Sequence, residues 1–361
     1  MRVVVAPDSF KGTATAAVIA TAIADGWTSV RPHDSVVRVP MADGGEGTLD
    51  AFATAYPDAA RIPVEVRGPD DRTVATSWLR LRDGRGVVEL ASTSGITLLD
   101  PLRPGTAHTI GFGQAVAAAL DHGVDGLVLG IGGSASTDGG LGLLRALGLR
   151  TTSGAGATGS VALDTVGGVD RSHLRALPPR GVQVLGDVDS PLLGPTGAAA
   201  VFGPQKGLVE PGEVIAAEGR LARWAARFPD IDPASPGAGA AGGAGFGLLA
   251  WGAHITPGAP AVASALGLAD AVADADLVIT GEGRFDLQSA AGKVPATVRA
   301  LAAGRPVALV AGAIEAATDG FAAAVSLRDL AAAERGDPGA ALTDTVHFGR
   351  EAGAALARSR A

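Results

Sequence analysis

Short loops that combine acidic residues with glycine follow several apolar runs of the sequence. They are residues 8–12 (DSFKG), 43–47 (DGGEG), 132–140 (GGSASTDGG), 187–190 (DVDS) and 281–286 (GEGRFD). In open parallel sheets, ligands bind outside the carboxyl ends of the strands. Carboxylates, hydroxyls and glycine amides at so many predicted strand ends indicate a site for a phosphorylated or metal-bound ligand.

Lysine occurs only three times, as Lys11, Lys206 and Lys293, and asparagine is absent. A GC-rich genome explains this bias, so each remaining lysine is a candidate for a position where arginine cannot serve. All three lie in loops that contain glycine. Acids, lysines, glycines and hydroxyls are the groups used in phosphoryl transfer, where catalysis is mostly positioning and charge neutralisation.

Other phosphate and metal motifs are absent or incomplete. Gly292-Lys293 is followed by valine, so there is no Walker A loop. Residues 130–135 fit a loose dinucleotide pattern, but no acidic residue at 150–157 could bind a ribose. The chain has no cysteine, and its histidines are scattered singly. A metal would therefore be held by oxygen ligands, which suits Mg²⁺ carrying nucleotide phosphates.

The elements that position these loops are those of an α/β protein. The hydrophobic pattern predicts strands at 3–6, 35–39, 125–131, 182–186, 276–280 and 306–311, and an antiparallel meander over 61–90. Helices are predicted at 13–28, 47–55, 106–121, 211–227 and 293–302, with another starting at 139. We expect the glycine-rich segment 234–253 to be a packed helix–loop junction, because apolar residues follow it directly.

A parallel α/β unit at each end surrounds a mixed middle, which predicts an insertion. We expect an outer domain at 1–60 plus 265–361 and an inserted domain at 61–264.

Composition excludes several classes of protein. The 361 residues carry a net charge of −8, which argues against a nucleic-acid binder. Hydrophobic residues make up 47%, enough for a large core, but no apolar stretch is long enough to span a membrane. No targeting segment is recognised at the start, so we expect a cytoplasmic protein.

Together the motifs resemble the bacterial glycerate kinase type 1 family from end to end. The segments that carry the resemblance are VAPDSFKG (5–12), ADGGEGT (42–48), GIGGSASTDGG (130–140), GDVDSPLLGPTGAAAVFGPQKG (186–207), PGAGAAGG (236–243) and GEGRFDLQSAAGKVP (281–295). The resemblance implies ATP-dependent phosphorylation of D-glycerate, usually to 2-phosphoglycerate. It also implies a flavodoxin-like domain with a second α/β domain inserted, and a site in the cleft between them.

Position by position, the resemblance together with residue type suggests roles for individual side chains. Substrate binding is expected of Asp8, Ser9, Lys11, Arg284 and Gln288, and nucleotide binding of Gly44, Gly45, Gly132, Gly133, Ser134 and Asp138. Metal binding is expected of Glu46, Asp189 and Glu282, and catalysis of Asp187, Asp286, Lys206 and Lys293.

Within these sets, Asp187 is the first candidate for orienting or deprotonating the attacking hydroxyl, and Asp286 the second. Arg284 is expected to hold the carboxylate of glycerate, and the alternative is that it pairs with the neighbouring acids Glu282 and Asp286. Thr137 and Ser190 stand where the family often has asparagine, and the loop at 108–113 is less polar than usual.

The sequence leaves two other functions open. An NAD-dependent hydroxyacid dehydrogenase would need the missing ribose acid. A non-enzymatic organic-acid binding protein would need net positive charge in its cleft. The sequence also leaves open which hydroxyl is phosphorylated, and whether the protein is a monomer or a homodimer.

Overall fold

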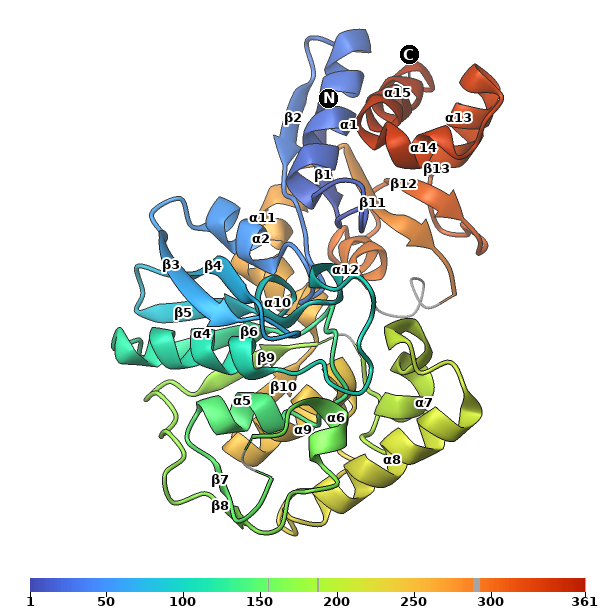
Figure 1. Ribbon diagram of the computed structural model, residues 1–361. Helices are drawn as coiled ribbons and strands as arrows, with labels where there is room; N and C mark the ends of the chain where they lie inside the picture. Colours follow the sequence, from blue (N-terminus) through green and yellow to red (C-terminus); the bar gives the residue numbers. More distant parts are fainter. Residues whose placement is uncertain (155, 187, 288–292, 361) are drawn as a thin grey trace. The chain divides into compact units, whose positions relative to one another are not determined.

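The computed structural model describes residues 1–154, 156–186, 188–287 and 293–360. This part of the chain forms two compact units, coloured along the sequence in Figure 1. Unit 1 comprises Met1–Asp43, Asp50–Pro57 and Ala259–Ala361, and unit 2 comprises Gly44–Leu49 and Asp58–Gly258.

Unit 1 is built on a five-stranded parallel sheet. Its order is β13-β12-β11-β1-β2, with the strands β1 (Arg2–Pro7), β2 (Ser35–Arg38), β11 (Leu277–Phe285), β12 (Val307–Ile314) and β13 (Ala323–Ser326). Numbered within the unit alone, this is the 2-1-3-4-5 order of flavodoxin-like folds. The chain turns in opposite directions from β1 and from β11, so the switch point of the sheet lies between these two strands.

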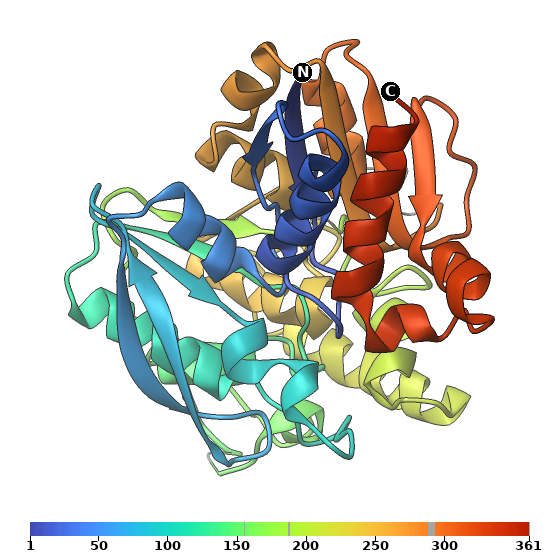
Figure 2. The ribbon, with the colours of Figure 1, turned by 90° about the horizontal axis from the view of Figure 1, so that it is seen from above.

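Helices cover both faces of this sheet. Val3 and Val5 share a core with helices α1 (Ala16–Val30), α13 (Leu327–Arg335), α14 (Ala340–Thr343) and α15 (Thr345–Arg358). Successive strand residues face opposite sides, so Val4 points to the other face, where α12 (Val294–Leu301) packs on β11. Figure 2 shows α1 and α15 side by side, with both chain ends at the same end of the unit. Burial on both faces explains why β1 is a continuous apolar run.

Unit 2 contains a six-stranded mixed sheet of order β10-β9-β6-β5-β4-β3. The strands are β3 (Ala60–Arg67), β4 (Thr73–Arg80), β5 (Arg85–Glu89), β6 (Gly126–Gly130), β9 (Val182–Leu185) and β10 (His254–Thr256). The first three pair antiparallel and the others parallel, so the predicted meander is confirmed. The helices α4 (Ile110–Asp121), α5 (Leu141–Ala146), α7 (Ala198–Phe202), α8 (Pro211–Ala225) and α9 (Ala240–Trp251) contribute to one large core.

The remaining elements are short. Strands β7 (Arg150–Thr151) and β8 (Val169–Asp170) form a separate pair. The helices are α2 (Thr48–Ala55), α3 (Ala91–Ser94), α6 (Gly159–Ala162), α10 (Gly258–Ala265) and α11 (Leu268–Ala273), and two single 3₁₀ turns lie at Ile96–Leu98 and Pro204–Lys206. Within the described ranges, no helix has the length and apolar content to cross a membrane.

The glycine-rich segment is packed, as the sequence predicts. Residues 241–243 adopt left-handed backbone angles at the start of α9. A Cβ on Gly242 would lie 2.0 Å from the carbonyl oxygen of Ser136, so only glycine fits there. Phe246 and Leu248 follow and are fully buried. This segment is therefore part of the core of unit 2 rather than a linker.

Candidate functional site

The switch point of unit 1 creates an opening at the carboxyl end of its sheet. Strand β1 pairs with β11 only as far as Pro7 and Gly281, whereas β11 continues beside β12 as far as Phe285. The loop after β1 lies at the edge that β11 leaves open, and its Asp8 amide donates to the Gly281 carbonyl (2.8 Å). Ligands of doubly wound sheets bind at such a crevice.

A cavity of about 580 Å³ lies here, and all of its lining residues belong to unit 1. We call it the charged cavity, because four acids and four bases line it: Asp8, Glu282, Asp286, Glu315, Lys11, Arg284, Lys293 and Arg328. Ser9 also contributes to the wall. The structure thus brings together those predicted site residues of the first and last motifs that it describes.

Asp8 is the more deeply buried of the two buried acids in this cavity, the other being Glu282. The side chain of Asp8 is 3% exposed, and its Oδ1 accepts a hydrogen bond from the Ser9 amide (2.7 Å). Burial raises the pKa of Asp8 well above its usual value. The negative charge of Asp43 raises this pKa further, Lys11 offsets part of the effect, and Glu282 adds a smaller increase. Several carboxylates near one another in little water form a site that gains from a cation or a proton.

Lys11 supplies a positive charge that acts on Asp8. Its Nζ lies 3.2 Å from Oδ2 of Asp43. The Asp43 carboxylate, with help from Asp8 and Glu282, raises the pKa of Lys11 above its ordinary 10.5. The lysine is therefore a permanent cation at physiological pH.

Arg284 is engaged with acids of the same cavity. One guanidinium nitrogen lies 2.5 Å from Oε2 of Glu315, and Nε lies 3.9 Å from Oδ2 of Asp286. The side chain is nevertheless 64% exposed, so this pairing is of the kind that solvent weakens. Arg284 can exchange Glu315 for the carboxylate of a ligand without leaving a buried charge unpaired.

Ser9 carries a buried hydroxyl without a partner. The residue is 5% exposed, and its Oγ makes no hydrogen bond to any described residue. Buried polar groups in native structures are rarely left unpaired. A hydroxyl of this kind in a cavity wall indicates that a polar ligand or water supplies its missing hydrogen-bond partner.

In unit 2, the two glycine-rich loops contact each other. The Gly132 amide donates to the Gly44 carbonyl (3.0 Å). A Cβ on Gly132 would lie 2.5 Å from Cα of Gly45, and one on Gly44 would lie 2.6 Å from the carbonyl oxygen of Leu185. Gly133 needs its left-handed φ of +75°. These glycines are required for close backbone packing, whatever else they do.

The carboxylate of Asp138 accepts four hydrogen bonds within unit 2. This buried carboxylate accepts them from the Thr109 amide and hydroxyl (both 2.9 Å) and from the amides of Gly140 (3.1 Å) and Gly142 (3.2 Å). It thereby ties the start of α4 to the start of α5, where a negative charge also suits the helix dipole. These bonds hold the Asp138 carboxylate between the starts of the two helices.

Lys206 is the buried lysine of unit 2. It is 2% exposed, and its Nζ donates to Oγ of Ser134 (2.7 Å) and to the carbonyl oxygen of Ser136 (2.6 Å). Burial lowers the pKa of Lys206 from 10.5 to about 7, and the charge of Asp138 opposes this only in part. Next to it, the buried hydroxyls of Ser136 and Thr137 have no hydrogen-bond partner in the described chain.

The remaining predicted residues are placed as follows. Glu46 and Asp189 are exposed in unit 2, whereas Glu282 lines the charged cavity of unit 1. Across the described ranges, no group of three or more Asp, Glu or His side chains could by itself hold a metal ion. Asp187 and Gln288 lie outside the described residues.

Two charged residues of the cavity were not anticipated from the sequence. Glu315 directly follows β12, which runs three residues beyond its predicted end at 311. Arg328 lies in the first turn of α13, immediately after β13, a strand that was not predicted. Both lie just after a strand, as Asp8 does, whereas the predicted loop at 281–286 is strand as far as Phe285, so Glu282 lies inside β11. The missing signal was the extent of the strands.

Comparisons with known proteins agree with the motifs and the fold. The glycerate kinase family matches residues 3–336. Glycerate 2-kinase of Escherichia coli K12 is 39% identical over 332 residues, covering 87% of this chain and 86% of the relative. Glycerate kinase of Bacillus subtilis 168 is 39% identical over 335 residues, covering 87% and 85%. A crystal structure of a glycerate kinase 2 from Salmonella typhimurium LT2 superposes with a TM-score of 0.81 at 36% identity, covering 100% of this chain and 98% of that one. The chain belongs to the glycerate kinase family.

Proposed function

We propose that this enzyme transfers the terminal phosphoryl group of ATP to D-glycerate, and that the product is 2-phosphoglycerate. The observation that carries the acceptor site is the unpartnered buried hydroxyl of Ser9 beside Asp8, in a cavity at the switch point of a parallel sheet. The choice of the 2-hydroxyl is supported by the glycerate 2-kinase among the relatives. Family membership leaves the dehydrogenase and the binding-protein alternatives without support.

Arg284 holds the carboxylate of glycerate in this proposal. Its planar fork matches a carboxylate in a bidentate manner, and its contact with the carboxylate of Glu315 supports this role. Asp8 and Ser9 bind the hydroxyl end of the acceptor, because a carboxylate and a hydroxyl can both accept a hydrogen bond from an alcohol.

Lys293 and Lys11 offset the charge of the transferred phosphoryl group. Lys293 lines the charged cavity as the residue that precedes α12. Lys11 stays protonated throughout, because Asp43 stabilises its charge. Fixed cations where charge develops contribute several kcal/mol to such reactions, typically about 3–4 for one contact.

We propose that unit 2 binds phosphate through one lysine, one serine and the glycines of two loops: Lys206, Ser134, Gly132, Gly133, Gly44 and Gly45. Lys206 and Ser134 are already hydrogen-bonded to each other, which holds the loop in one conformation. For Asp138 we propose positioning of this loop, since its carboxylate has four donors of its own.

Asp286 is the described candidate for the base that orients the attacking hydroxyl, and the same role for Asp187 stays a prediction. Comparing Asp286→Asn with Asp8→Asn separates base from binding residue. Loss of the base lowers kcat at saturating glycerate, whereas loss of a binding contact raises the KM for glycerate.

Mg²⁺ fits this site only as a partner of the nucleotide. The described acids form no complete cage, but Mg²⁺ commonly uses one or two carboxylates together with substrate phosphates. Glu282, buried in the cavity wall, would hold it, while Glu46 and Asp189 are exposed in unit 2. When bound, the ion would neutralise phosphate charge.

We also propose that units 1 and 2 are the two domains expected from the sequence, and that the enzyme acts in the cytoplasm, where ATP is available.

Phosphorus NMR of the product formed from D-glycerate and ATP tests the reaction and its regiochemistry. We expect a 2-phosphate ester and about 10⁴-fold weaker use of glycerol, which lacks the carboxylate that Arg284 binds. Efficient phosphorylation of glycerol would contradict both the substrate and the role of Arg284.

A further inference from the structure

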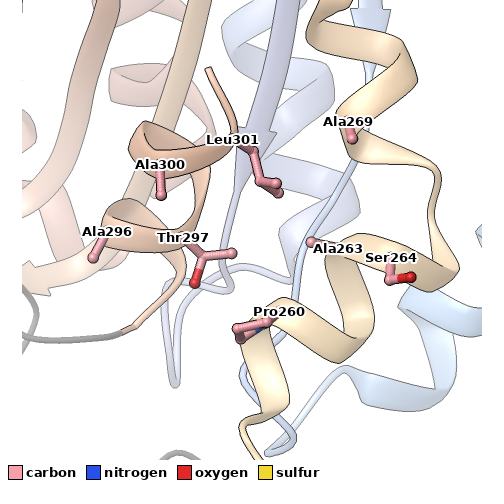
Figure 3. Close-up of a pocket in the computed structure, with 8 residues that line it drawn as sticks. All are labelled: Pro260, Ala263, Ser264, Ala269, Ala296, Thr297, Ala300 and Leu301. Carbon is pink, nitrogen blue, oxygen red and sulfur yellow. The ribbon is translucent and has the colours of Figure 1, made fainter. Parts of the chain in front are cut away.

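A second cavity of unit 1 has the opposite character to the charged one. It measures about 530 Å³ and lies between α10, α11 and α12 (Figure 3). Its wall includes Pro260 and Ala263 from α10 and Ala296, Thr297 and Ala300 from α12. Among the described residues that line it, none carries a charge. We call it the apolar cavity.

Helix α12 and the residue that precedes it contribute to the lining of both cavities. Ala296, Thr297, Ala300 and Leu301 follow the i, i+1, i+4, i+5 spacing of one helix face, and Lys293 precedes the helix as its N-cap residue with an extended backbone. Lys293 lines the charged cavity, and the other four line the apolar one. At 1.5 Å per residue, Lys293 and Ala300 are about 10 Å apart along the axis. A single elongated ligand can therefore contact both cavities along this helix.

The lining of the apolar cavity restricts what it can bind. A phosphate or carboxylate would need a cation or several donors, and a metal ion would need carboxylates or histidines; the wall offers neither. Small side chains at 263, 296 and 300 leave room for a flat ring. Figure 3 shows Thr297 and Leu301 projecting from α12 into the space bordered by Pro260 and Ala263. An uncharged ring with a few polar atoms matches this wall.

The nucleotide of the proposed reaction has these two parts, a neutral flat base and a chain of charged phosphates. We propose that the apolar cavity binds the purine base of ATP, with the phosphates directed along α12 toward Lys293. This assignment rests on the proposed function only for the identity of the nucleotide, and it places the base on residues that no motif of the sequence singled out.

Filling the cavity tests the assignment. Ala296 is half-buried in the wall, so Ala296→Phe should occupy the space of the base without disturbing the sheet. Calorimetry in the absence of acceptor should show the Kd of ATP raised at least tenfold. The Kd of inorganic tripolyphosphate, which has no base, should not change, and neither should the KM for D-glycerate. The matched control is Ala17→Phe, which places the same group in a separate hollow of unit 1 beside Val346.

A photoreactive azido-ATP gives a second readout that needs no variant. Crosslinks within residues 258–273 or 294–301 of the wild-type protein support the assignment, and crosslinks only within unit 2 overturn it. Unchanged ATP affinity in Ala296→Phe also overturns it. So does a changed oligomeric state with intact ATP affinity, which would make the cavity a contact between copies.

The result is distinguishable from failure of the proposed function. If the wild type binds ATP but transfers no phosphate to glycerate, the acceptor assignment fails, while the binding and crosslinking experiments still decide where the base lies.

Discussion

Lys206 offers a direct test of the electrostatics of unit 2. The protein has only three lysines, so selectively labelled lysine side chains give three resolvable NMR signals. The Lys206 signal should titrate with a midpoint near pH 7, because burial disfavours its charged form. The Lys11 signal should not titrate below pH 10.5, because Asp43 favours its charged form.

The same shift predicts how stability depends on pH. In the unfolded chain Lys206 keeps its proton up to about pH 10.5, whereas in the folded protein it loses it near pH 7. Unfolding therefore takes up a proton between these values, and the free energy of unfolding rises with pH across this window. The full shift corresponds to about 5 kcal/mol. Below pH 7 both states are protonated, and the whole cost of burying the ammonium is present.

Lys206→Met isolates this contribution. The free energy of unfolding of the wild type minus that of the variant, from urea titrations, should increase by about 2 kcal/mol between pH 7 and pH 9. A difference that stays constant over this range, or a Lys206 signal that titrates near pH 10, would refute the argument. Repeating the NMR titration with ATP tests the functional proposal, because a nearby phosphate should raise the midpoint.

Other parts of the structure give three further expectations. Asp8→Asn should raise the free energy of unfolding at pH 7–8, because the raised pKa of Asp8 means that its contribution to stability is lost as pH rises above about 4. Thermal melts should show that the stability gained by the variant shrinks toward pH 4. An equal gain at pH 4 and at pH 8 would exclude this cause. Gly132→Ala should destabilise by about 1–3 kcal/mol in urea titrations, since its Cβ would meet Gly45, whereas Gly212→Ala, in α8 with open space around it, is the control and should be neutral to slightly stabilising. Steady-state kinetics should show Arg284→Lys raising the KM for glycerate and Glu315→Gln lowering it, with the KM for ATP unchanged in both; equal shifts in both KM values would indicate a purely structural arginine.

The sequence predicted most of the fold because apolar runs and turn residues mark the long elements. The run at 3–6 became β1, and the alternating segment at 61–90 became the antiparallel strands of unit 2. Strand β13, at Ala323–Ser326, was not predicted from the sequence, because alanine has little preference for strands. Strand β10 has three residues, too few for a periodic pattern.

The residue types of the site were predictable, but their partners were not. The strand-end rule found Asp8 and Glu282, which line one cavity. Lys206 was singled out by the rarity of lysine, yet its partner Ser134 lies 72 residues away, and no local pattern reports such a contact. Asp138 belongs to a recognisable loop, but only the fold reveals that Thr109 uses its carboxylate.

The discontinuity of unit 1 has a consequence for synthesis on the ribosome. Strand β1 needs β11 as its neighbour, and these strands are separated by more than 260 residues. At roughly 5–20 residues per second, β1 and β2 emerge tens of seconds before β11 can pair with them. The long continuous stretch of unit 2 is translated completely in this interval. Vectorial synthesis therefore favours unit 2 as the first part to fold, and the nascent N-terminal segment, with its exposed valine run, is the part of the chain most open to chaperone binding.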